Sequence, residues 1–167
     1  MQAVNFDTFL SLMEKNWPEA HSALMKSFPL IDRISAIHDG VRAKVLAEHS
    51  LQGGDFGILT ALRRMGEPYV LSPTLLRQYM LVSSGGLTKM LHRLESCEMI
   101  SRVDSPDDGR IKLVKLTAKG KQTIEAVVAQ VQKSNRRVLA HFDAEEIEKL
   151  DSLLSKLSHL LEDELRI

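Results

Sequence analysis

Two closely spaced helix starts followed by a hairpin pattern, between Leu71 and Lys119, constrain the fold more than any other feature. Ser72-Pro73 is typical of a helix N-terminus, because serine caps free amide groups and proline suits the first turn. Val82-Ser83-Ser84 predicts a tight turn and a second capped helix. After Met99, two short strand-like runs flank a tip dense in Asp, Pro and Gly, which predicts a β-hairpin. The predicted order is therefore helix, tight turn, helix, hairpin.

The second helix of this predicted motif has one apolar and one polar face. Leu87, Leu91 and Leu94 recur at helical spacing and form the stripe that we expect to be buried. In a helix-turn-helix, the second helix lies in the major groove of DNA, and its start directs free amide groups at phosphate. The opposite face carries short and cationic side chains that can reach phosphates or base edges. We predict DNA contacts for Ser83, Ser84, Gly85, Thr88, Lys89 and His92.

Two adjacent glycines, Gly85 and Gly86, stand in the first turn of that helix. Glycine is unfavourable inside a helix, so a pair of glycines needs a physical reason. We favour close approach of the backbone to a DNA groove. The alternative is tight packing against the preceding helix.

The tip of the predicted hairpin carries Arg110 beside acidic residues. An arginine in this place can enter the narrow minor groove, where the negative potential is high. Alternatively, Arg110 is a surface residue that pairs locally with Asp108 or Asp104. Lys112, on the second predicted strand, either contacts phosphate or solvates the outer face of that strand.

Charge is unevenly distributed along the chain, although the formal net charge is +0. Residues 60–121 hold 11 Lys and Arg against 6 Asp and Glu, whereas residues 143–167 hold 3 basic and 8 acidic residues. A basic middle favours contact with a polyanion, and an acidic end favours a different role. Because modest asymmetry of this kind is common, it supports the motif but would not identify it alone.

The stretch from Leu51 to Gly120 resembles the MarR family of bacterial regulators. The matching segments are DFGILTALRRMGEPYVLSPTLL, LVSSGGLTKMLHRLE and SRVDSPDDGRIKLVKLTAKG. The resemblance implies a dimeric repressor or activator that binds a palindromic operator, often released by a small phenolic or aromatic acid or by oxidation. It also implies recognition-helix contacts from Ser84, Gly85, Thr88 and Lys89, and a wing-tip contact from Arg110.

The chain departs from the family pattern at two positions. Family wings often carry a basic pair after the aspartates, and here Gly109 takes one of these places. Met90 stands where relatives frequently have arginine. The resemblance therefore implies a weaker wing contact, and it does not carry over any contact that uses that arginine.

The C-terminal segment predicts an amphipathic helix with a broad leucine stripe. So much apolar surface on a terminal helix needs cover, either from its own chain or from a partner. The family resemblance favours a partner, with the first helices of the chain completing the interface. Two recognition helices about 34 Å apart could then read successive major-groove faces. The predicted dimer seam comprises Ile147, Leu150, Leu154, Leu157 and Leu161.

The resemblance also implies an effector pocket between the dimerisation helices and the winged domain. A small aromatic or phenolic acid needs an apolar slot with a cationic anchor. The candidate lining residues are Trp17, His21, His38, Arg42 and Phe56. For each residue taken singly, we favour ordinary packing or solvent exposure over a role in the pocket.

Cys97 is the only cysteine, which excludes an internal disulfide and fits a reducing cytosol. Together with the family resemblance, this implies a bacterial cytoplasmic location. A role as a redox sensor is one interpretation of its place near the end of the recognition helix. We favour ordinary packing, because the neighbouring Glu95 and Glu98 disfavour the reactive thiolate.

Catalytic and metal-binding patterns are missing from the sequence, which has no HExxH, CxxC, GxSxG or Gly-rich phosphate loop. We therefore expect no enzyme activity, cofactor or metal site. No apolar run approaches the roughly 20 residues of a membrane span. The competing function is a winged-helix module that binds another protein instead of DNA.

We expect a mainly α (α+β) fold, in which a winged helix-turn-helix with a two-stranded wing is flanked by N- and C-terminal dimerisation helices. Residues 1–50 would form N-terminal helices of the dimer and pocket, 51–120 the DNA-binding domain, and 121–167 the C-terminal dimerisation helices. The expected function is a sequence-specific transcriptional regulator, a homodimer on a palindromic operator, acting as a repressor that a small-molecule effector releases.

Overall fold

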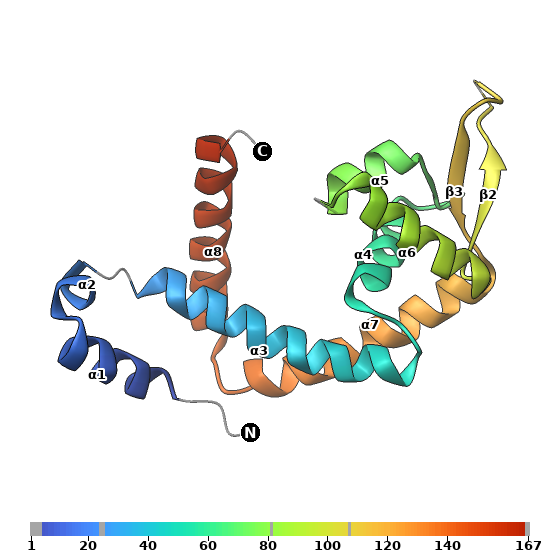
Figure 1. Cartoon of the computed structure of the whole chain (residues 1–167). Helices are drawn as coiled ribbons and strands as arrows, with labels where there is room; N and C mark the ends of the chain where they lie inside the picture. The colour runs from blue at the N-terminus through green and yellow to red at the C-terminus, as the bar shows by residue number, and fades with distance from the viewer. Residues whose placement is uncertain (1–4, 24–25, 81, 107, 166–167) are drawn as a thin grey trace.

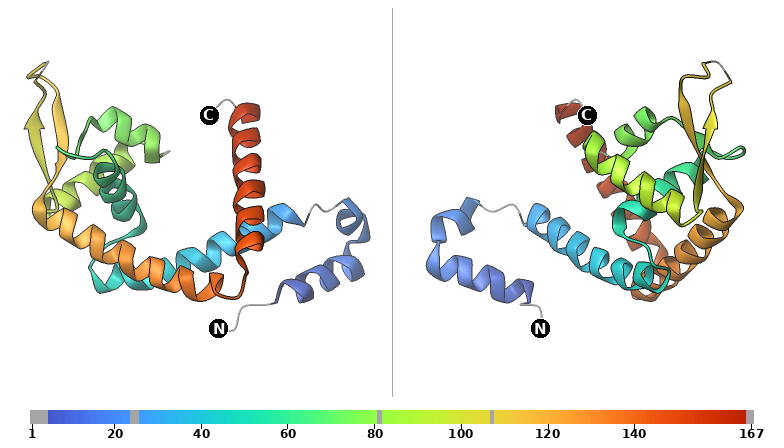
Figure 2. Two further views of the ribbon diagram at one scale, coloured as in Figure 1. Left: turned by 180° about the vertical axis from the view of Figure 1, so that it is seen from behind. Right: turned by 45° about the vertical axis from the view of Figure 1, so that its right-hand side comes forward.

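Two long antiparallel helices form the base of the molecule, and the other elements are attached to them (Figure 1). The computed structural model describes residues 5–23, 26–80, 82–106 and 108–165. The base consists of α3 (Ser27–Glu48) and α7 (Ala118–Leu139), which pack along part of their length. At one end lie α1 (Phe6–Asn16) and α2 (Pro18–Ala23), and α8 (Ala144–Leu165) stands up from the base, apart from the other elements (Figure 2).

The other end of the base carries a compact helix-turn-helix with a hairpin. Its helices are α4 (Gly53–Arg64), α5 (Pro73–Met80) and α6 (Ser84–Ser96). Its strands are β1 (Val70–Leu71), β2 (Ile100–Asp104) and β3 (Lys112–Leu116), in the order β1-β3-β2 with antiparallel pairing. The two-stranded wing is confirmed as the hairpin of β2 and β3, and β1 adds a third strand along the other edge of β3. The sequence did not predict β1, because a strand of two residues is too short to show an alternation of apolar and polar positions.

Three helices begin at the side-chain N-caps that the sequence predicts. The Ser83 hydroxyl accepts a hydrogen bond from the Gly86 amide at 3.2 Å, and the Thr117 hydroxyl accepts one from the Gly120 amide at 3.0 Å. At α8, the Asp143 carboxylate accepts from the Glu146 amide at 2.8 Å, and the Glu146 carboxylate accepts from the Asp143 amide at 3.0 Å. These reciprocal bonds are a capping box, as the spacing predicts.

The first long helix, α3, starts earlier than the sequence suggests. We expect it to follow Pro29, but it begins at Ser27 and includes the proline in its first turn. Proline is tolerated there, because the first amide groups of a helix have no partner within the helix. Gly40 lies in the middle of α3 without interrupting it.

The core of the molecule gathers around α4. Ile58, Leu59 and Leu62 of this helix are fully buried. From α6, the predicted stripe of Leu87, Leu91 and Leu94 is buried as well, so its orientation is confirmed. In the parts of the chain that the structure describes, no helix is long and apolar enough to cross a membrane.

Large apolar side chains remain uncovered on the base and on α8. Apolar residues of α3, α7 and α8 face solvent in the single chain, and no described side chain of α8 is buried. These uncovered residues include Ile34, Ile37, Val41, Val138, Leu139, Leu150, Leu153, Leu154, Leu160 and Leu161.

Candidate nucleic-acid interface

The polar face of α6 is open to solvent, while its leucine face packs into the core. All six residues predicted to contact DNA on this segment have exposed side chains or, for Gly85, an exposed backbone. The Thr88 hydroxyl donates to the Ser84 carbonyl oxygen at 2.9 Å, which keeps it close to the helix surface. The structure therefore places Ser83, Ser84, Gly85, Thr88, Lys89 and His92 on one accessible surface.

Packing does not explain the glycine at position 85. A Cβ atom added at Gly85 would meet no other atom within 4 Å, so no neighbouring element requires its small size. A Cβ added at Gly86 would lie 3.2 Å from the Ser83 hydroxyl, which already binds the Gly86 amide. The contact at Gly86 is with the N-cap of its own helix, so packing against the preceding helix accounts for neither glycine.

A groove of about 360 Å³ lies beside the N-terminal half of α6. Arg77 of α5 and Arg102 of β2 line it together with Ser84 and Thr88. The Arg102 guanidinium also lies 3.8 Å from the carboxylate of Glu95 on α6. Sequence reasoning did not select Arg102, because an arginine inside a strand gives no sign of the helix beside it.

The hairpin of β2 and β3 projects beyond the helices, and Arg110 is exposed near its tip (Figure 1). The Arg110 amide donates to the Asp108 carboxylate at 2.9 Å, and Asp104 forms an ion pair with Lys112. Among the described residues, the Arg110 guanidinium forms no ion pair. The local pairing of its side chain with Asp108 or Asp104 is therefore not what the structure shows.

A buried carboxylate on α4 forms an ion pair with α6. Asp55, in the first turn of α4, is 1% exposed and binds Arg93 of α6, with the Arg93 Nη2 atom 2.6 Å from Asp55 Oδ1. This hydrogen bond raises the pKa of Arg93 above its ordinary value, against the opposing effect of burial. The pair was missed at the sequence level, although the spacing of Gln52 and Asp55 carries a capping-box signal.

Comparison with known proteins identifies the family of this fold. The model described as "MarR family" matches residues 49–111. The HTH-type transcriptional regulator PecS of Dickeya dadantii is 32% identical over 132 residues, which cover 78% of this chain and 80% of PecS. The chain belongs to the MarR family. It is therefore a MarR-family transcriptional regulator, and its helices and sheet form the winged helix-turn-helix of that family.

Solved MarR structures agree with this assignment. MarR from Escherichia coli, in its apo form, is 28% identical and aligns with a TM-score of 0.66 over 77% of this chain and 94% of that chain. A mutant of the same protein, complexed with operator DNA, is 26% identical and aligns with a TM-score of 0.67 over 87% of this chain and 97% of that chain.

The candidate effector residues of this MarR-family chain are spread over the molecule. Trp17 and His21 belong to the α1–α2 end of the base, away from α4 (Figure 1). His38 forms a hydrogen bond with Asn135 of α7, with 3.1 Å between Nε2 and Oδ1. Arg42 and Phe56 are the two candidates that the structure brings together, because the Arg42 guanidinium lies 5.3 Å from the centre of the Phe56 ring.

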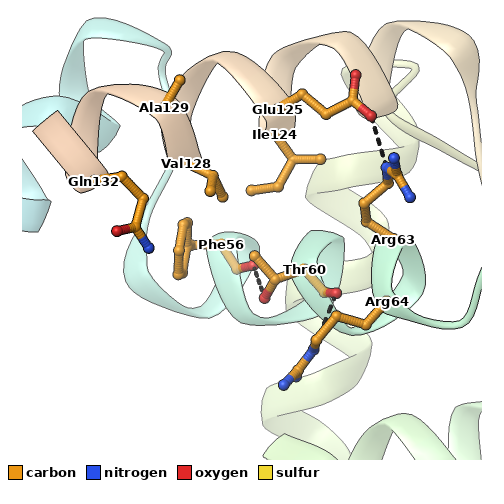
Figure 3. A pocket seen from close by; sticks show the side chains of 9 residues that line it. All are labelled: Phe56, Thr60, Arg63, Arg64, Ile124, Glu125, Val128, Ala129 and Gln132. Carbon is orange, nitrogen blue, oxygen red and sulfur yellow. Dashed lines mark hydrogen bonds and ion pairs between the residues drawn. The ribbon is translucent and has the colours of Figure 1, made fainter. Parts of the chain in front are cut away.

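Phe56 lines a cavity of about 710 Å³ between α4 and α7 (Figure 3). Ile124 and Val128 add apolar surface opposite the ring, and Arg64 stands at the edge of the cavity with its Nε atom 3.3 Å from the Thr60 carbonyl oxygen. The Arg63 guanidinium is held by Glu125, at 2.7 Å from Nε to Oε1. The cavity thus combines an aromatic wall, an aliphatic wall and a cation.

The predicted dimer seam lies on one face of α8. Leu150, Leu154 and Leu161 are exposed, and Ile147 and Leu157 are half-buried. In this MarR-family chain, the seam is therefore an apolar surface that its own protomer leaves largely uncovered.

Proposed function

We propose that this MarR-family regulator is a homodimer that binds a palindromic operator, with α6 in the major groove and the wing in the adjacent minor groove. The observation that carries the proposal is the exposed polar face of α6 opposite a buried leucine stripe. The buried stripe fixes which side of α6 faces outward, and a helix-turn-helix reads DNA with that side. The MarR complex with operator DNA, 26% identical to this chain, supports the same use of the fold.

The charges around α6 suit a phosphate backbone on both sides of the helix. Lys89 and the free amides of the first turn lie on the helix itself, Arg77 and Arg102 lie in the groove beside it, and Arg110 lies on the wing. Cations at these places would fix the register of the protein on the duplex, and the short side chains of α6 would contact base edges.

A second copy of the chain is the proposed cover for the apolar surfaces of α3, α7 and α8. These three helices expose many large apolar side chains, and exposed apolar patches are typical of interaction sites. The stripe on α8 has the spacing of a helix that packs against other helices, and α8 stands clear of its own base (Figure 2). A two-fold dimer would also present two copies of α6 at a separation of about 34 Å, which matches one turn of DNA.

The proposed effector is a small aromatic or phenolic acid in the cavity between α4 and α7. The Phe56 ring offers a stacking surface, and Arg64 offers a cation for the carboxylate. Arg42 of α3 does not line the cavity but lies over the Phe56 ring, which connects this wall of the cavity to α3. Because α4 supports α6 and α7 belongs to the base, a ligand between them would change the position of α6 and release the operator, as a repressor requires.

Selection of duplexes from a random pool by the purified protein at low ionic strength tests this function. We expect an enriched inverted repeat with half-sites about 10 base pairs apart. Salicylate, as a probe acid, should release the selected operator from the wild type and less readily from Phe56→Ala, while Lys133→Ala, outside the cavity on α7, should behave as the wild type does. A pool without enrichment would contradict DNA recognition, and equal release from Phe56→Ala would contradict the effector site.

A further inference from the structure

A charged group is buried where the base of the molecule passes into the DNA-binding domain. The Asp55 carboxylate is 1% exposed and accepts a hydrogen bond from the Gln52 amide at 2.9 Å. It also forms an ion pair with Arg93. The Arg93 Nε atom lies 3.0 Å from Oδ2 and 3.2 Å from Oδ1, and its Nη2 atom lies 2.6 Å from Oδ1. One carboxylate therefore joins the first turn of α4 to the proposed recognition helix, α6.

The same turn of α4 makes a second close contact with α6. A Cβ atom added at Gly54 would lie 2.1 Å from the Met90 sulfur, so Met90 packs directly on the backbone of α4. Met90 and Arg93 are three residues apart and lie on one face of α6. Their two partners, Gly54 and Asp55, are adjacent, which ties the orientation of α6 to one turn of α4.

This turn of α4 is rigidly attached to the base. Only four residues separate it from the end of α3, and they form a tight turn in which the Leu51 amide donates to the Leu46 carbonyl oxygen at 2.9 Å. Leu46 and Leu51 are both buried in the core. A short hydrogen-bonded turn therefore joins the end of α3 to the first turn of α4, and the contacts of that turn connect α6 to the base.

The pair is better suited to fixing an orientation than to adding stability. Burying the Asp55 charge costs solvation energy that its attraction to Arg93, whose side chain is 35% exposed, roughly offsets. A forked guanidinium-carboxylate contact, in contrast, accepts only a narrow range of geometry. Asp55 is buried and negative, so it cannot contact DNA itself. An effect of this residue on DNA binding is therefore indirect, and its contact with Arg93 leads to α6.

We propose that Asp55 is a positioning residue for DNA recognition. Through Arg93, it holds α6 at a fixed orientation to the base, and in the dimer this sets the half-site spacing that the two recognition helices accept. This inference rests on the proposed dimeric operator complex and adds to it the residue that determines spacing.

The test compares operators of different half-site spacing, using full-length wild type and Asp55→Asn. Adding or removing one base pair moves a half-site by about 3.4 Å and turns it by about 35°. We expect the wild type to prefer the selected spacing by about tenfold or more, and Asp55→Asn to lose most of that preference while it binds the selected operator about tenfold more weakly. Glu98→Gln is the matched control, because it removes an exposed ion pair with Lys119 in the same domain.

The ratio of the affinity for the selected spacing to the affinity for the altered spacings distinguishes a positioning role from a merely structural one. If Asp55→Asn weakened binding to all spacings equally, with helix content and dimerisation retained, the proposal would be overturned. Should Asp55→Asn fail to fold, Arg93→Gln breaks the same contact from α6, and an unchanged spacing preference in that variant would overturn it equally. A wild type that binds no duplex would instead contradict the proposed function.

Discussion

At the scale of single residues, Gly85 distinguishes the two roles that the start of α6 could have. The position is open, because an added Cβ would touch nothing within 4 Å in the protomer. A glycine required for packing would have close neighbours, as Gly120 does, where an added Cβ would lie 2.1 Å from the Met99 carbonyl oxygen. Packing within the protomer therefore does not explain the absence of a side chain at position 85, and the proposed close approach of DNA would explain it.

Gly85→Ala should therefore separate folding from DNA binding. We expect the free energy of unfolding to stay the same or to rise by up to about 1 kcal/mol, since alanine is favoured over glycine in helices. Operator affinity should fall about tenfold, or by about 1.4 kcal/mol. Gly53→Ala is the control, because that glycine also begins a helix with open space around it. Undiminished operator affinity in Gly85→Ala would show that the groove does not come close to this position.

Some residues of the site could be predicted from the sequence, and others could not. Ser83 and Leu87 are evident because capping and helical periodicity are local signals. Arg102 and the Asp55–Arg93 pair depend on contacts between segments far apart in the chain, which local patterns do not encode.

At the scale of elements, a third strand, β1, stabilises the wing beyond what a hairpin alone would provide. The register pairs Ile100 with Leu116 and Asp104 with Lys112, and β1 pairs with the other edge of β3, where Val70 lies opposite Lys115. Cross-strand pairs of this kind stabilise a sheet, and a third strand protects one edge of the hairpin. The hairpin was predictable from its turn residues, whereas β1 became visible only in three dimensions.

Arg110→Ala tests the wing. Because the side chain is exposed and removed from the core, we expect the stability of the fold to be unchanged. Operator binding should weaken by roughly 1–3 kcal/mol if the guanidinium enters the minor groove. The loss should be greatest on operators with A·T pairs at the wing position, where the minor groove is narrow. Lys119→Ala removes a cation at the other end of the sheet and serves as the control; equal losses in both variants would indicate a general effect of charge.

At the scale of the whole molecule, the single chain leaves large apolar side chains of α3, α7 and α8 exposed. Among the described residues, the buried core is confined to the winged domain and the adjoining parts of α3 and α7, and none of the five apolar residues of the proposed seam on α8 is buried. The amphipathic character of α8 was evident from the sequence. Its separation from the base was not, because a leucine stripe has the same spacing whether it packs on its own chain or on a partner.

Leu154→Asp places a charge in the centre of the proposed seam and should convert the dimer to monomers. A carboxylate in an apolar interface loses its hydration without gaining a partner, so association becomes unfavourable. Ser152→Asp adds the same charge to the opposite face of α8 and should leave the dimer intact. Light scattering at fixed protomer concentration measures both variants, and a dimer that survives Leu154→Asp would exclude this seam.

The salt dependence of operator binding tests most directly whether α6 lies in the groove of a duplex. The logarithm of the affinity should fall linearly with the logarithm of salt concentration, with a slope of about −0.9 for each phosphate neutralised. Lys89→Ala should reduce the steepness of that slope by about one phosphate, while Lys133→Ala on α7 should retain the wild-type slope. Absence of binding to any duplex at low ionic strength, or an affinity that does not change with salt, would contradict this account.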